Sequence, residues 1–121
     1  MLNQLDGKSM IFEPSFLKIN VGDKVTFIPE QLGHNSASLL IPKNSKPWKS
    51  QTNQRFSLDF NQQGIYIYEC SIHGVMAMIG IIQVGEAKNL EEAKDFLNKH
   101  RNKVIMNKNR IDDYLKKLAT N

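Results

Sequence analysis

Only one cysteine, Cys70, occurs among the 121 residues, so the chain cannot form an internal disulfide bond. A lone thiol either packs as a small apolar group or takes part in chemistry. Long apolar runs are also missing. Residues 74–84 form the most apolar stretch, which is far shorter than the about 18 residues that a membrane-spanning helix needs. The sequence therefore excludes a disulfide-stapled fold and predicts no membrane insertion.

Blocks of like charge are missing as well. The chain carries 16 Lys and Arg residues against 12 Asp and Glu residues, a formal net charge of +4. Most of the excess lies in residues 86–121, and no basic run is interleaved with aromatic residues. Nucleic acid is therefore not an expected partner. The length and the 40% hydrophobic content fit one globular domain.

Short β-prone segments separated by turn residues fill residues 1–85. Apolar and polar residues alternate strictly at 56–60, which predicts a half-buried strand, and residues 65–70 add β-branched and aromatic side chains. Further strands are predicted at residues 10–12, 16–19, 25–28 and 78–84. Many short strands divided by turns favour an antiparallel sandwich or barrel.

A helical period replaces this pattern in residues 86–121. Asn89 is the expected N-cap of a helix that ends near His100, where a positive imidazole would favour the helix dipole. A second amphipathic helix is predicted to lie against the sheet body through the apolar stripe of Ile111, Tyr114, Leu115 and Leu118.

A Cys-x2-His-x4-Met motif joins the last two predicted strands. It contains Cys70, His73 and Met78, and His34 precedes the cysteine by 36 residues. A thiolate, two imidazoles and a thioether are the donors of a blue-copper electron-transfer site, a trigonal His2Cys plane with a weak axial Met. A rigid site between the preferences of Cu(I) and Cu(II) changes little when an electron arrives or leaves. The motif therefore predicts one copper ion in a one-electron carrier.

Besides this motif, the sequence contains the Phe12-Glu13-Pro14 run, the Gly33-His34-Asn35 segment, the predicted strand at residues 22–29 and the two predicted helices. In these features the sequence resembles the pseudoazurins, a family of cupredoxin electron carriers. The similarity covers nearly the whole chain. It implies a mainly β fold, a cupredoxin Greek-key β-sandwich with two C-terminal α-helices. Residues 1–85 would form the sandwich with the copper site, and residues 86–121 a two-helix extension packed on the same domain.

The resemblance also implies a function and its residues. The copper ligands would be His34, Cys70, His73 and Met78, and the imidazole edge of His73 would face solvent within an apolar patch used for electron entry and exit. The protein would be a monomeric periplasmic carrier. Its partners would be redox proteins, such as a nitrite reductase or a cytochrome.

The chain departs from the pattern of the family at three places. Members usually begin with a strand ahead of the segment that matches residues 1–3, so the first strand and an export signal are expected to be missing. Lysines that commonly surround the copper end are replaced by Gln4, Leu32 and Glu69, with Lys49 remaining, so electrostatic steering should be weak. Ile72 replaces a common proline and restores a backbone N–H, which should raise the reduction potential.

Other interpretations of the same residues stay open. A periplasmic copper delivery or storage protein would use the same donors but expose them. A zinc site is less suitable because thioether is a poor zinc ligand. A copper enzyme would need a second copper with its own histidines, and only three histidines occur. Asn35 is expected to connect the two ligand loops, with a simple turn role as the alternative. Trp48 is expected to pack within a loop, with part of a docking surface as the alternative.

Overall fold

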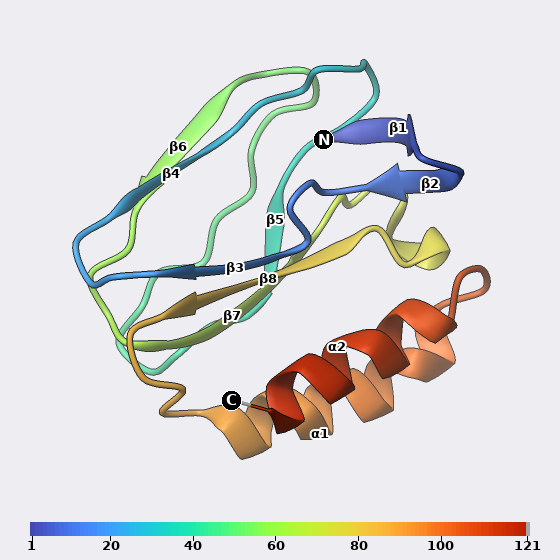
Figure 1. The fold of residues 1–121 in the computed structure, drawn as a ribbon. Coiled ribbons are helices and arrows are strands. Elements are labelled where there is room, and N and C mark those ends of the chain that lie inside the picture. Colours follow the sequence, from blue (N-terminus) through green and yellow to red (C-terminus); the bar gives the residue numbers. More distant parts are fainter. Residues whose placement is uncertain (121) are drawn as a thin grey trace.

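The computed structural model describes residues 1–120 and shows strands above a pair of helices (Figure 1). The bounds of the strands are β1 Leu2–Leu5, β2 Lys8–Ile11, β3 Phe16–Ile19, β4 Lys24–Phe27, β5 Ala37–Leu40, β6 Phe56–Asp59, β7 Gly64–Glu69 and β8 Ile79–Val84. Two short 3₁₀ helices, η1 Gly74–Met76 and η2 Arg101–Lys103, accompany the α-helices α1 Leu90–His100 and α2 Asn109–Ala119.

The strands form three hydrogen-bonded groups. A four-stranded sheet has the order β3-β8-β7-β5, while β1 pairs with β2 and β4 pairs with β6. The antiparallel pairing expected from the pattern of short strands does not hold for β3 and β8, which run parallel. Most of the sandwich separates these two strands in the sequence, so no tight turn fixes their relative direction.

Both faces of the four-stranded sheet are buried. Strand β7 shows this alternation: Tyr66 and Tyr68 belong to the cluster between the sheet and the β4–β6 pair, whereas Ile65 and Ile67 belong to the cluster under the helices. Alternate side chains of a strand point to opposite faces of the sheet, so β7 contributes side chains to two separate hydrophobic cores. The mainly β fold with two C-terminal helices is confirmed.

Trp48 lies in the first of these clusters. Its ring packs near Phe27, Phe60 and Tyr66, with an edge-to-face contact to Phe60 at 5.9 Å between centroids. The indole Nε1 donates a hydrogen bond of 2.9 Å to Ser36 Oγ. The predicted packing role of Trp48 is therefore confirmed.

The helices begin and end close to the predicted residues, but two side chains act differently. Asn89 forms no side-chain cap hydrogen bond; its amide instead exchanges two hydrogen bonds with the backbone of Ile65, which fixes the start of α1 to β7. His100 is buried and stacks on Phe96. Burial, with Lys103 nearby, lowers the pKa of His100, so the expected positive imidazole is disfavoured. Within residues 1–120, no helix has the length and apolarity needed to cross a membrane.

Two strands were not predicted. Strand β1 forms a hairpin with β2 through Asp6 and Gly7, which both have positive φ. Strand β5 pairs with β7 across a register shift between Ser38 and Leu40. Neither segment has a clear alternation of apolar and polar residues, so their strand character depends on the partner strand.

Candidate metal centre

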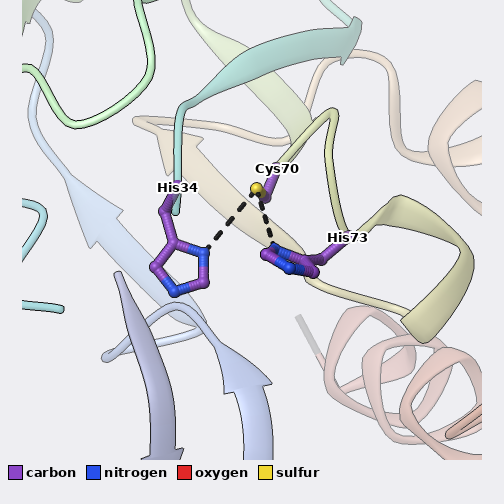
Figure 2. Close-up of side chains that lie close together, drawn as sticks. All are labelled: His34, Cys70 and His73. Carbon is purple, nitrogen blue, oxygen red and sulfur yellow. Dashed lines mark hydrogen bonds between the residues drawn. The ribbon is translucent and has the colours of Figure 1, made fainter. Parts of the chain in front are cut away.

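Two separate segments bring His34, Cys70 and His73 together at one end of the sandwich (Figure 2). His34 lies between β4 and β5, Cys70 directly follows β7, and His73 is the residue before η1. Their potential ligand atoms all lie within 4.8 Å of one another. His34 and Cys70 are fully buried, whereas His73 is partly exposed.

Both imidazoles direct the same ring nitrogen at the cysteine. Nδ1 of His34 lies 3.8 Å from Cys70 Sγ, and Nδ1 of His73 lies 3.5 Å from it. With metal–nitrogen bonds of about 2.0–2.1 Å and a metal–sulfur bond of about 2.3 Å, a trigonal arrangement separates nitrogen and sulfur by about 3.8 Å. The three donors therefore fit around a single first-row transition metal.

Cys70 and Met78 stand at the two ends of the loop that joins β7 to β8. The Cys70 N–H donates a hydrogen bond of 3.0 Å to the Met78 carbonyl, so the two residues face each other where β7 and β8 diverge. The Met78 side chain is fully buried in the same apolar cluster as Cys70. The structure therefore places Met78 beside Cys70 in the core, next to the cluster of the two histidines and the cysteine.

The other ring nitrogen of His34 has its own partner, which the sequence did not reveal. His34 Nε2 lies 2.5 Å from Asn3 Oδ1, in β1. Because an amide oxygen only accepts, Nε2 carries the proton and Nδ1 is left with a free lone pair. Burial first, and then the charge of His73, lower the pKa of His34 to about 4. Both effects favour the neutral imidazole that a metal requires.

Asn35 connects the two segments that carry the ligands. Its Oδ1 accepts a hydrogen bond of 2.8 Å from the Ser71 N–H, and its Nδ2 donates one of 2.8 Å to Ser71 Oγ. Nδ2 also lies 3.3 Å from the Ser50 carbonyl. Asn35 directly follows His34 and is itself buried, whereas Ser71, which directly follows Cys70, is exposed, so these hydrogen bonds join the two ligand-bearing segments at the edge of the core. The predicted connecting role is confirmed.

Known proteins share this arrangement of strands and sequence. Residues 1–85 match the copper-binding proteins of the plastocyanin/azurin family. The chain belongs to this family. It is 35% identical over 97 residues to the pseudoazurin of Paracoccus pantotrophus, with 78% of this chain and 67% of that protein covered.

Two further relatives place the chain among the pseudoazurins of this family. A protein of Rhizobium leguminosarum bv. viciae that carries the pseudoazurin name is 42% identical over 97 residues, which cover 78% of this chain and 64% of that protein. The chain thus spans about two thirds of the length of the Rhizobium leguminosarum and Paracoccus pantotrophus proteins. The crystal structure of pseudoazurin from Methylobacterium extorquens AM1 is similar with a TM-score of 0.83 and 28% identity, covering 98% of this chain and 94% of that chain.

Of the four positions near this plastocyanin/azurin-type site where lysines are common in the family, one carries a lysine. Leu32 and Ile72 are exposed apolar residues, Gln4 is exposed and uncharged, and Lys49 is exposed. The carboxylate of Glu69 folds back on the loop of residues 70–78, here called the ligand loop, since a Cβ added to Gly74 would collide with Glu69 Oε1. Burial raises the pKa of Glu69, with Lys103 and Lys49 opposing this effect.

Asn53 is another residue of the site that the sequence did not reveal. Its Oδ1 accepts a hydrogen bond of 2.6 Å from the Gly33 N–H, and its own N–H donates one of 2.9 Å to the His34 carbonyl. Gly33 itself has a φ of +100°, a conformation that favours glycine. These contacts fix the backbone on both sides of His34. No motif marks Asn53, because it lies in a turn 19 residues further along the chain.

Proposed function

We propose that this protein is a type 1 blue copper electron-transfer protein of the pseudoazurin type, which shuttles single electrons between respiratory redox partners. One copper ion would be held by His34, Cys70, His73 and Met78. The convergence of two imidazole Nδ1 atoms on one cysteine sulfur, at 3.8 and 3.5 Å, carries this proposal. Residues 1–85 would form the copper-binding sandwich, and residues 86–121 would pack on the same domain.

The proposed ligands combine soft sulfur with imidazole, which is the donor set of a blue-copper site. Bound copper would supply the one-electron redox chemistry. The protein residues keep the donors in place: Asn3 orients His34, and Asn35 ties the His34 segment to the loop after Cys70. Hydrogen bonds from neighbouring residues to the proposed ligands and their segments hold the geometry of the site, so little rearrangement would accompany electron transfer.

His73 offers the route for electrons to the surface. It is the partly exposed member of the cluster, whereas His34 and Cys70 are fully buried. Ile72 is its exposed neighbour. Leu32 is exposed as well and precedes Gly33, at which an added Cβ would lie 3.9 Å from Cε1 of the His73 ring. We propose that redox proteins such as a nitrite reductase or a cytochrome dock here, with little electrostatic steering because three of the four lysine positions described above carry no lysine.

The compartment and the oligomeric state follow from the same proposal. As pseudoazurins are periplasmic carriers, this protein would act in the periplasm as a monomer. It would not be an enzyme. In residues 1–120, His34, Cys70 and His73 form the one group of His, Cys, Asp or Glu side chains that could hold a metal ion. His100 stacks on Phe96 instead of joining this group.

A copper delivery or storage role is the alternative. A protein that hands over its metal needs donors that a partner can reach. Full burial of His34 and Cys70 supports a retained ion over a transferred one. The thioether in the proposed set likewise favours copper over zinc.

Absorption and voltammetry of the copper-loaded protein test the proposal. We expect an intense visible thiolate-to-copper band in the oxidised form and a reversible one-electron wave. Cys70→Ser should abolish the band, because the charge-transfer donor is removed, while Ser57→Ala, at an exposed position of β6, provides a control outside the proposed ligand set. A colourless oxidised protein, or rapid transfer of copper to a competing chelator without a reversible wave, would contradict electron transfer and favour delivery.

A further inference from the structure

Arg110 on α2 reaches the metal-binding end of the molecule from the C-terminal helices. Its guanidinium donates hydrogen bonds to four backbone carbonyls in two segments far away in the sequence. In β2 it contacts the Met10 carbonyl at 2.8 Å and the Ser9 carbonyl. In the ligand loop it contacts the carbonyls of Met76 at 3.4 Å and Ala77 at 3.3 Å.

Two of these carbonyls belong to residues with unusual backbone conformations. Met10 has a φ of +49° and Ala77 a φ of +58°, in the left-handed region that residues with a side chain rarely adopt. Such conformations persist where surrounding contacts hold them. Ala77 is also the residue immediately before Met78, so its conformation sets the direction in which the Met78 side chain leaves the loop.

The guanidinium is committed to these carbonyls. Among residues 1–120 no carboxylate forms an ion pair with Arg110, and the side chain is partly buried. Burial lowers the pKa of Arg110, with Tyr114 opposing this effect. A planar group with five N–H donors can serve several carbonyls in two segments at once, whereas a lysine ammonium cannot reproduce that geometry.

The helix pair approaches the ligand loop through other contacts as well (Figure 1). Asn107, before α2, donates from Nδ2 to the Met76 carbonyl at 3.0 Å, and the Ile105 N–H donates to the Val75 carbonyl at 2.7 Å. These two hydrogen bonds fix η1, and the Tyr114 hydroxyl of α2 donates to the Ile79 carbonyl beyond it. Among the hydrogen bonds that the helices of residues 1–120 make, those of Arg110 are the ones that reach Ala77 and β2.

We propose that Arg110 is a positioning residue for the proposed axial ligand: it holds the left-handed Ala77 so that Met78, the next residue, keeps its place beside Cys70. The proposal rests on the copper-binding function above. It assigns to the C-terminal extension a part in tuning the metal, because the axial ligand tunes the potential of such a site.

The simpler explanation is that Arg110 only anchors α2. Two matched variants distinguish these roles: Arg110→Lys retains the charge but loses the fork of donors, and Arg101→Lys does the same at an arginine that pairs with Asp112 at 2.5 Å. If Arg110 only anchored α2, Arg110→Lys would lower the stability of the protein as Arg101→Lys does, and both variants would leave the metal site unaltered. Arg110→Gln, which also removes the charge, serves as a second variant.

The first measurement uses the copper-loaded protein. We expect Arg110→Lys to raise the reduction potential and alter the relative intensities of the thiolate-to-copper bands, while Arg101→Lys matches the wild type. A retracted thioether donates less electron density to the oxidised ion and so disfavours that state. If Arg110→Lys and Arg110→Gln both retain the wild-type potential and spectrum, the proposal is overturned.

The second measurement uses the copper-free protein and amide hydrogen exchange. The Ala77 N–H donates to the Gly74 carbonyl, and the Cys70 N–H to the Met78 carbonyl. We expect these two amides to exchange about tenfold faster in Arg110→Lys, with the amides of β6 unchanged. Uniform acceleration across all amides would show a general anchor and overturn the proposal. A wild-type protein that is colourless with copper would refute the proposed function, while local acceleration would still support the role of Arg110 in the loop.

Discussion

His34 Nε2 donates a hydrogen bond of 2.5 Å to Asn3 Oδ1, joining a residue of β1 to a buried imidazole 31 residues away. The bond leaves Nδ1 of the imidazole directed at Cys70 Sγ. We expect Asn3→Leu to weaken copper affinity by about 10- to 100-fold, the usual effect of losing such a contact. Competition with a copper chelator measures this affinity. Asn20→Leu, at an exposed position, is the control, and equal affinity of the Asn3 variant and wild type would contradict the assigned role.

The hydrogen bonds between Asn35 and Ser71 predict a loss of stability in Asn35→Ala. The variant removes the hydrogen bonds that the buried Asn35 side chain makes to the Ser71 N–H, the Ser71 hydroxyl and the Ser50 carbonyl. We expect the free energy of unfolding of the copper-free protein to fall by about 1–3 kcal/mol, measured by urea denaturation. Asn98→Ala, which removes an exposed side chain of α1, should change it by less than about 0.5 kcal/mol. Similar losses in the two variants would argue against the connecting role.

Ile72 predicts a difference in reduction potential. Ile72 lies between Cys70 and His73 in the sequence, and its backbone N–H would be removed in Ile72→Pro. A donor near the thiolate stabilises negative charge on sulfur and makes the oxidised site less favourable, so we expect Ile72→Pro to have a lower potential than wild type. Voltammetry measures it, and Ile72→Ala, which keeps the N–H, should remain close to wild type. An unchanged potential in the proline variant would refute this prediction.

His100 predicts a loss of stability on mild acidification. Burial lowers its pKa below the about 6.5 of an unfolded histidine, so the unfolded chain binds the proton more readily. The contribution of the neutral His100 to the free energy of unfolding is complete above about pH 6.5, the pKa of the unfolded chain. It is lost as the pH falls toward the pKa of the folded protein, and its size is about 1.4 kcal/mol for each unit between these two pKa values.

Urea denaturation of the copper-free protein between pH 5 and 7.5 tests this prediction. His100→Phe keeps an aromatic ring beside Phe96 but cannot titrate, while His34 and His73 contribute equally to both proteins. We expect the difference in free energy of unfolding between wild type and His100→Phe to change across this pH range. A constant difference would show that His100 has the same pKa in the folded and unfolded states.

Local sequence patterns predicted most of the sandwich. The alternation at residues 56–60 and the β-branched run at residues 65–70 correspond to β6 and β7, and the two amphipathic segments correspond to α1 and α2. Strand β5 was missed because its residues pair with β7 through an irregular register rather than by their own pattern. The parallel direction of β3 and β8 also required the assembled sheet, since β-propensity carries no information about direction.

The sequence by itself determined the candidate donors, because the spacing between Cys70, His73 and Met78 confines them to one loop and His34 supplies the second imidazole. The tertiary structure decided which groups orient these donors. Asn3 and Arg110 are ordinary polar residues in the sequence, and only folding brings one against His34 and the other against Ala77. The physical reason is that a covalent loop limits where its own side chains lie, whereas hydrogen bonds between distant segments exist only after the core has brought those segments together.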